Sequence, residues 1–212
     1  MKLVVLSRSQ PYARVILRYL RDRRTPYPLF RSWLRRAGWL LGLSLAADLR
    51  LVEVDVETPL GAARELELPK QPLIVNILGA GEFLVQGILD VYPGAPLGFI
   101  ATKRVEKGED VSIKVLYERL PREWRDPAII GDPMLATGGT LSYAIGRLKS
   151  AGADPIIVAT VIAAPEGLER LEAEYGDSAI VYTLAVDERL NKEKFIVPGL
   201  GDAGDRSLGV EF

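Results

Sequence analysis

The chain has 212 residues, of which 48% are hydrophobic and 26% are charged, and its formal net charge is -1. These values predict a folded domain with a sizeable core, and they exclude a disordered chain or a strongly basic nucleic-acid binder. Cysteine and histidine are both absent, which excludes disulfides, Cys/His metal sites, cysteine nucleophiles and Ser-His-Asp triads. Any catalysis therefore depends on carboxylates, hydroxyls, backbone amides, Lys, Arg or a metal held by carboxylates and substrate.

The first residues are not expected to form a targeting signal. Met1–Leu6 is too short, and too soon followed by charged residues, to be a signal peptide. No apolar run reaches the roughly 18 residues that a transmembrane helix needs. We therefore expect a cytoplasmic protein without a membrane partner.

Two helices are expected in the first 50 residues. One begins near Pro11 and is broken at Thr25–Pro28, and the other carries apolar residues at spacings of three and four between Phe30 and Leu41. Leu51–Val56 alternates leucine and acidic residues with valine, which predicts a half-exposed strand.

From Leu73 onward, short apolar runs alternate with helical stretches. This alternation predicts an α/β fold with a central parallel sheet flanked by helices on both faces. The apolar runs are Leu73–Leu78, Leu97–Thr102, Ala128–Gly131, Ile156–Ala164 and Ile180–Val186.

A β-hairpin is expected to protrude from this sheet. Val111–Tyr117 alternates polar and apolar residues, and it follows Leu97–Arg104 after a turn at Glu106–Gly108. The hairpin, about residues 97–117, would carry exposed apolar side chains on one face, which indicates contact with another subunit.

The segment Ile129–Leu141 has the order needed to bind an anion: an apolar strand, an acid, a loop of small residues and an amphipathic helix. Gly138 and Gly139 allow successive backbone amides to converge, and the helix start adds a positive dipole end. Asp132, at the carboxyl end of the strand, is placed to accept hydrogen bonds from sugar hydroxyls. The segment predicts a site for a phosphorylated ribose. The alternative is an ordinary strand-to-helix turn, and neither a Walker loop nor a dinucleotide fingerprint is present.

A second polar loop lies near the C-terminus, at Phe195–Arg206. Its glycines and aspartates can expose backbone N–H and C=O groups to a flat polar ligand. Uracil presents O4, N3–H and O2 in a row, which two amides and one carbonyl can satisfy; the alternative is a solvated turn. A third loop, Leu78–Glu82, could bind diphosphate through its amides or be a tight turn only.

The N-terminal helices are rich in arginine. Eight arginines and a single acid, Asp22, lie between Arg14 and Arg36. This pattern indicates an anionic partner, a solvated helix face or ion pairs between subunits. An RNA surface is disfavoured, because no recognised module or interleaved exposed aromatics accompany the arginines.

Taken together, these segments resemble the uracil phosphoribosyltransferase family, of the type I phosphoribosyltransferase class, over nearly the whole chain. DPMLATGGT at Asp132–Thr140 is similar to the phosphoribosyl diphosphate loop of that family, and IVPGLGDAGDR at Ile196–Arg206 to its uracil loop. Shorter matches are Leu20–Asp22, Phe30–Arg31, Glu57–Gly61 and Ala164–Gly167. The resemblance implies a glycosyltransferase of pyrimidine salvage. It would convert uracil and 5-phosphoribosyl 1-diphosphate to UMP and diphosphate, with Mg²⁺ held mainly by substrate.

The resemblance also implies residue roles. The catalytic residues would be Asp132 on the ribose hydroxyls, Arg104 on the diphosphate, and Asp202 on the phosphoribosyl substrate or its metal. Uracil would be held by Ile196, Gly201, Asp202 and Ala203, mainly through the backbone. The phosphoribosyl diphosphate site would comprise Gly79, Arg104, Asp132, Pro133, Met134, Leu135, Ala136, Thr137, Gly138, Gly139, Thr140 and Asp202.

The organisation implied is one domain over residues 1–212, with a helical extension at about 1–50 and a uracil-binding hood at about 187–212. Archaeal members of the family are activated by GTP and inhibited by CTP. A comparable effector site would include Phe30, Arg31, Ser32, Trp33 and Leu34. A homodimer or homotetramer is expected.

The chain departs from the family pattern at one position. Gly79, in Ile77–Gly81, stands where the family has the arginine of its ILRAG diphosphate loop. A charged hydrogen bond worth roughly 1.5–3 kcal/mol would be missing unless Lys103 replaces it. The alternative function is therefore a weakly active or non-catalytic nucleotide-binding regulator on the same fold.

Overall fold

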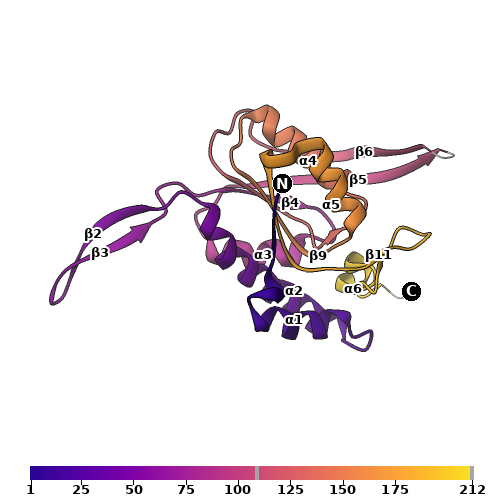
Figure 1. Ribbon diagram of the computed structural model, residues 1–212, viewed down its shortest axis with the longest axis horizontal. Coiled ribbons are helices and arrows are strands. Elements are labelled where there is room, and N and C mark those ends of the chain that lie inside the picture. The colour runs from indigo at the N-terminus through magenta and orange to yellow at the C-terminus, as the bar shows by residue number, and fades with distance from the viewer. Residues whose placement is uncertain (108–109, 211–212) are drawn as a thin grey trace.

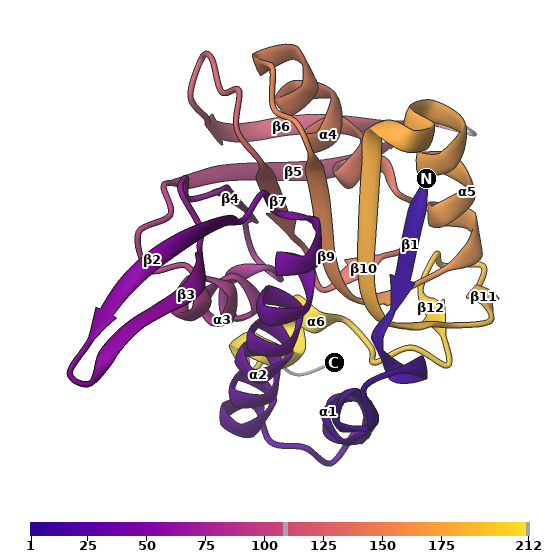
Figure 2. The same ribbon diagram turned by 60° about the vertical axis from the view of Figure 1, so that its left-hand side comes forward.

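The computed structural model describes residues 1–107 and 110–210, with the side chains of residues 104–112 outside the description. Within this range the centre is an eight-stranded sheet in the order β1-β10-β9-β7-β4-β5-β6, with the short β8 paired to β9 (Figures 1 and 2). All pairings in this sheet are parallel except the antiparallel β5–β6. The strands are β1 (Lys2–Val5), β4 (Leu73–Ile77), β5 (Leu97–Lys107), β6 (Asp110–Arg119), β7 (Ala128–Gly131), β8 (Met134–Leu135), β9 (Ile156–Ala163) and β10 (Ala179–Val186).

The central strands are apolar throughout because helices cover both faces of the sheet. Every residue of β4, β7 and β9 is buried, as expected for parallel strands between two helical layers. Neighbouring residues point to opposite faces, so that Ile74 joins one core cluster while Leu73 and Val75 join the other. The predicted α/β class with a central parallel sheet is confirmed.

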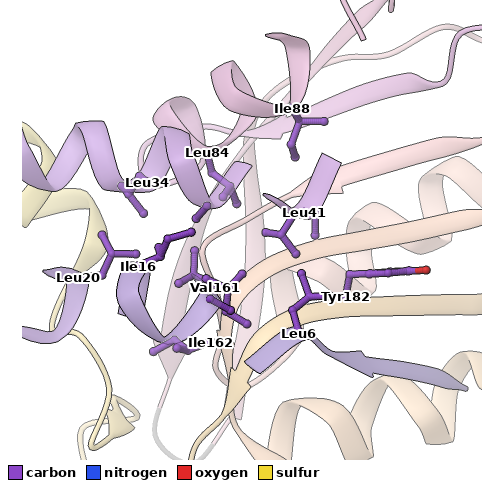
Figure 3. Packing of buried hydrophobic residues seen from close by; sticks show 14 of the residues in the cluster. Leu6, Ile16, Leu20, Leu34, Leu41, Leu84, Ile88, Val161, Ile162 and Tyr182 are labelled. Carbon is purple, nitrogen blue, oxygen red and sulfur yellow. The ribbon is translucent and has the colours of Figure 1, made fainter. Parts of the chain in front are cut away.

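Two groups of helices enclose the sheet. One face is covered by α1 (Pro11–Arg21), α2 (Tyr27–Leu45) and α3 (Glu82–Val91), and the other by α4 (Gly139–Ala151) and α5 (Pro165–Tyr175) (Figure 1). In the first core, Ile16, Leu34 and Leu84 from three helices pack with Val161 of β9 (Figure 3). Both α1 and α2 have proline in the first turn, where a missing backbone N–H removes no hydrogen bond.

The N-terminal segment contributes to the sheet as well as to one core. β1, which the sequence did not predict, pairs in parallel with β10 at the sheet edge. It is only four residues long and begins with a lysine, so its pattern is too short to indicate a strand. Among the described residues, short 3-10 helices are η1 (Leu6–Arg8), η2 (Ala46–Asp48) and η3 (Gly176–Ser178).

Two β-hairpins project in opposite directions (Figure 1). The predicted hairpin is present as β5 and β6, whose strands run further than expected, so that its turn falls partly outside the described residues. The strand predicted at residues 51–56 is β2 (Val52–Thr58), and it pairs with an unpredicted β3 (Gly61–Glu67) in a separate two-stranded sheet. β3 is almost entirely exposed, so its sequence has no apolar pattern that would predict a strand.

The C-terminal segment is small and only partly regular. β11 (Arg189–Leu190) pairs with β12 (Ile196–Val197), and α6 (Ala203–Leu208) follows. The segment begins where the backbone N–H of Asp187 donates to the carbonyl of Ala163, at the carboxyl end of β9. No helix in the described part of the chain is long and apolar enough to span a membrane.

Candidate active site

The loops singled out from the sequence gather at the carboxyl edge of the parallel sheet. Asp132 directly follows β7, and Leu78 directly follows β4, its neighbour in the sheet. The first turn of α6 lies against the second of these loops, since a Cβ built on Gly204 would be 4.0 Å from the backbone nitrogen of Ala80. Three segments distant in sequence thus share one edge, where ligands of open α/β sheets bind.

The loop at Asp132–Thr140, here called the anion loop, runs from β7 to α4. Pro133 lies alongside β9, where its carbonyl accepts hydrogen bonds from Val161 and Ile162 at 3.0 and 3.1 Å. The backbone N–H of Ala164 donates to Leu135 at 2.9 Å. The chain then turns through Gly138, whose φ is +77°, into the first residue of α4.

This path lines a small, open, polar pocket. It has a volume of about 100 Å³ and is lined by Asp132, Met134, Ala136, Thr137, Gly138, Gly139, Thr140 and Leu141. Of the residues predicted to bind phosphoribosyl diphosphate, Pro133 and Leu135 instead have buried side chains that support the loop. The remaining residues of the predicted loop are brought together around one volume at a helix start, which suits a phosphate group.

Asp132 is half-buried at the end of β7, and its Oδ1 accepts a hydrogen bond from the backbone N–H of Met134 at 3.1 Å. Burial raises the pKa of the Asp132 carboxyl to about 7, and the hydrogen bond from Met134 opposes that shift. A ligand that offers hydroxyl donors or nearby positive charge would favour the carboxylate form. Asp132 is thus suited to hold a sugar diol.

Two neighbours that the sequence did not single out support the anion loop. The hydroxyls of Thr102 on β5 and Thr140 on α4 lie 3.0 Å apart, which links the hairpin root to the loop. The guanidinium of Arg170 on α5 lies against the loop, since its Nη1 would be 3.4 Å from a Cβ on Gly139. Arg170 also pairs with Glu174 at 2.8 Å. The match at Ala164–Gly167, at the start of α5, was the available signal for this contact.

The loop after β4 has a different character. Gly79 has a φ of +96°, and a Cβ built there meets no described atom within 4 Å. The buried Asn76 precedes the loop and donates from Nδ2 to Glu82 at 2.7 Å, while its Oδ1 has no partner among the described residues. The backbone at Gly79 is therefore exposed to the site, without a side chain to contribute charge.

The predicted uracil residues follow one another from β12, through the turn at Pro198–Gly201, to the start of α6. Ile196 and Ala203 are buried, whereas Gly201 is exposed and has a φ of +79°. Asp202 begins α6 and accepts a hydrogen bond from the N–H of Asp205 at 2.9 Å through Oδ1. The turn can therefore present backbone groups beside a carboxylate.

The predicted diphosphate contact from Arg104 stays a prediction. Its backbone lies in β5 opposite Ile113, and its side chain falls outside the described residues. Lys103, the suggested substitute for the missing arginine, is exposed on the same strand.

The predicted effector residues occupy the start of α2. Phe30 and Leu34 are fully buried and Trp33 is 8% exposed, so these side chains belong to the core. Arg31 donates to the carbonyl of Ser207 on α6, and Ser32 accepts a hydrogen bond from Arg36. A ligand at this segment would meet Arg31, Ser32 or the backbone.

The order of the strands and the anion loop at their carboxyl edge place the protein in the type I phosphoribosyltransferase class. The AQ2163 protein from Aquifex aeolicus has the same fold, with a TM-score of 0.89, 36% identity and coverage of 99% of both chains. A hypoxanthine phosphoribosyltransferase from Staphylococcus aureus shares the fold at a TM-score of 0.50 and 12% identity, covering 79% of this chain and 83% of that chain.

The chain belongs to the uracil phosphoribosyltransferase family, whose family model matches residues 6–209. It is 45% identical to the uracil phosphoribosyltransferase of Aeropyrum pernix over 208 residues, or 98% of this chain and 97% of that protein. It is 41% identical to the uracil phosphoribosyltransferase of Thermus thermophilus over 205 residues, or 96% and 97% of the two chains.

Proposed function

We propose that this protein transfers the 5-phosphoribosyl group of 5-phosphoribosyl 1-diphosphate to N1 of uracil, with release of diphosphate and formation of UMP. The observation that carries the proposal is the cavity at the start of α4, beside Asp132, in a chain that belongs to the uracil phosphoribosyltransferase family over nearly its whole length. The turn before α6 supplies the second half of the site.

The proposed mechanism assigns binding and orientation to these loops. Amides of Ala136–Thr140 hold the 5′-phosphate, and Asp132 accepts hydrogen bonds from the ribose hydroxyls. As the bond from C1 to the diphosphate oxygen breaks, positive charge develops on the ribose and negative charge on the leaving diphosphate. Backbone groups of Ile196, Gly201 and Ala203 hold uracil with N1 close to C1, and N1 loses its proton as the new bond forms.

Mg²⁺ is part of the proposal. Among the described residues, no group of three or more acidic side chains could enclose a metal. We propose that Mg²⁺ is held mainly by substrate oxygens, with Asp202 as the protein carboxylate that could contribute. Bound in this way, the ion would neutralise charge on the leaving diphosphate.

A direct assay tests the function. The purified protein is incubated with 5-phosphoribosyl 1-diphosphate, Mg²⁺ and one nucleobase at a time, and nucleotide products are separated and quantified. We expect UMP with uracil and far less product with cytosine or the purines. Absence of UMP would overturn the proposal and leave the nucleotide-binding regulator, which rests on Gly79 alone, as the function to test by direct ligand binding.

Regulation by GTP and CTP is a further part of the proposal. It is supported by an open basic cavity of about 730 Å³ between the α1–α2 connection and the turn at Pro198–Gly201 (the uracil turn). The cavity is lined in part by Arg21, Arg23, Arg24, Tyr27 and Arg206, and it lies beside the predicted effector residues 30–34, which do not line it. Activity measured with and without each nucleotide tests it. No change in rate or assembly would remove the effector.

Assembly as a homodimer or homotetramer is proposed from the exposed apolar side chains of the hairpins. Leu116 and Tyr117 on β6 are 58% and 48% exposed, and Leu60 at the tip of β2–β3 is fully exposed. Apolar surface of this kind is typical of subunit contacts. Light scattering of the purified protein tests it, and a monomer at all concentrations would contradict it.

A further inference from the structure

The uracil turn is held from behind by an ion pair that joins distant parts of the chain. Arg21, the last residue of α1, faces Asp187, which follows β10, with Nη2 to Oδ1 at 2.5 Å and Nη1 to Oδ2 at 2.8 Å. The Asp187 side chain is only 4% exposed and that of Arg21 27%. This two-bond arrangement gives a guanidinium–carboxylate pair a fixed orientation as well as strength.

Both members of the pair bind the same residue of the turn. Arg21 donates from Nη1 to the carbonyl of Gly199 at 2.8 Å, and Asp187 accepts from the N–H of Gly199 at 2.9 Å. Gly199 has a φ of +65°, and a Cβ there would lie 2.1 Å from the carbonyl oxygen of Ile196. The pair thus satisfies both backbone groups of the tightest point in the turn.

Asp187 is itself held by the central sheet. The N–H of Asp187 donates to the carbonyl of Ala163 at 2.8 Å, so the carboxylate starts from the rigid end of β9. A second arginine, Arg206, donates to the carbonyls of Leu200 at 2.6 Å and Asp22 at 2.8 Å. The turn is therefore tied to the end of α1 at Gly199, through Arg21, and again at Leu200, through Arg206.

The turn's own sequence does little to hold it. Gly199 and Gly201 both have positive φ, and glycine loses more conformational freedom on ordering than any other residue. The backbone groups proposed to bind uracil, at Ile196 and Gly201, flank the residue that Arg21 and Asp187 hold. Loss of the pair would leave a flexible turn in place of a preformed one, and binding would then have to order it.

We propose that Arg21 and Asp187 are positioning residues for the nucleobase, which hold the Pro198–Gly201 turn in its base-binding shape. This inference rests on the proposed function. The anion loop is built on β7, β8 and the start of α4, and within the described part of the chain neither Arg21 nor Asp187 forms a hydrogen bond to it. The pair therefore acts on uracil binding much more than on binding of 5-phosphoribosyl 1-diphosphate.

The test compares KM values for the two substrates in Arg21→Gln, Asp187→Asn and Arg21→Lys. We expect KM for uracil to rise about 10- to 100-fold in Arg21→Gln and Asp187→Asn, as for loss of a charged hydrogen bond, with KM for the other substrate nearly unchanged. Arg21→Lys keeps the charge and one donor, so it should recover part of the uracil affinity. The matched control is Arg147→Gln, which breaks the ion pair with Glu118 between α4 and β6.

Equal increases in both KM values, or an unchanged KM for uracil, would overturn the inference. Thermal unfolding monitors each variant, and if Arg21→Gln does not fold, Arg21→Lys and Asp187→Asn decide by the same comparison. Uracil affinity is also measured by calorimetry. A wild type that binds uracil but makes no UMP refutes the proposed function, while weaker binding by Asp187→Asn would still support the positioning role. A wild type that binds no uracil refutes both.

Discussion

The two halves of the site are built in different ways. The anion loop runs from Asp132 to Thr140 within one strand–loop–helix unit. Its Thr140 forms a hydrogen bond with Thr102, 38 residues away. The uracil turn depends on Arg21, 178 residues from Gly199, and on Arg206, which binds a carbonyl 184 residues away at Asp22. In the proposed function, the locally encoded loop binds the phosphate that all substrates of the class share. The turn held by distant residues binds the base, which differs among them.

Two core substitutions, one beside each half of the site, test whether the two halves are stabilised independently. Phe30 is fully buried under the Arg206 guanidinium, whose carbon lies 4.3 Å from the ring centre. Phe30→Ala should lower the free energy of unfolding by about 3–5 kcal/mol. By hydrogen exchange, protection should fall more in residues 196–206 than in residues 132–140, because the Arg206 tie loses its support.

The matched variant is Leu148→Ala, on α4 and in the core of the opposite face. It should lower the free energy of unfolding by about 2–5 kcal/mol and reverse the pattern of exchange. If both variants loosen both segments equally, the two halves of the site are not separately supported.

Asp132→Asn tests the anion loop alone. It should reduce kcat/KM for 5-phosphoribosyl 1-diphosphate about 10- to 100-fold, because a charged acceptor for ribose hydroxyls is lost. Steady-state kinetics measure the effect. Asp126→Asn, which removes an acid paired with Lys70 at the opposite end of β7, is the control and should leave kinetics unchanged. A wild-type rate in Asp132→Asn would show that another group holds the ribose.

Gly79→Arg tests the missing arginine. A charged hydrogen bond to diphosphate contributes about 1.5–3 kcal/mol, but a side chain at a φ of +96° costs about 1–2 kcal/mol. We therefore expect KM for 5-phosphoribosyl 1-diphosphate to fall by less than about 10-fold. Gly79→Ala supplies the strain without the charge. If the arginine variant is no better than the alanine variant, the missing arginine does not limit activity.

The last prediction concerns the pH dependence of stability. The folded-state pKa of Asp132, about 7, lies above its ordinary value of 3.8, so the folded protein binds more protons than the unfolded chain between these values. The contribution of this group to stability is therefore present below pH 3.8 and is lost as pH rises toward 7. The Tm of Asp132→Asn relative to wild type, both without ligand, should be higher at pH 8 than at pH 5. A difference in Tm that does not change with pH would contradict the raised pKa.

The main sheet could be predicted because parallel strands covered on both faces are almost uniformly apolar. Leu73–Leu78 and Ile156–Ala164 matched β4 and β9 nearly residue for residue. β1 and β3 could not be predicted, since an edge strand and an exposed hairpin strand carry no continuous apolar face. The predicted effector segment shows a different limit of sequence reasoning. A family motif suggested a binding role there, whereas Phe30 and Leu34 are core residues.

The sequence by itself determined the α/β class, the anion loop and the family, because apolar periodicity, glycine positions and contiguous motifs are local properties of a chain. Only the tertiary structure decided that Arg21, Asp187 and Arg206 converge on the uracil turn. It also decided that Arg170 flanks the anion loop. Contacts between residues more than 160 positions apart leave no spacing pattern to recognise. They arise when β9 and β10 bring the two ends of the chain to the same edge of the sheet.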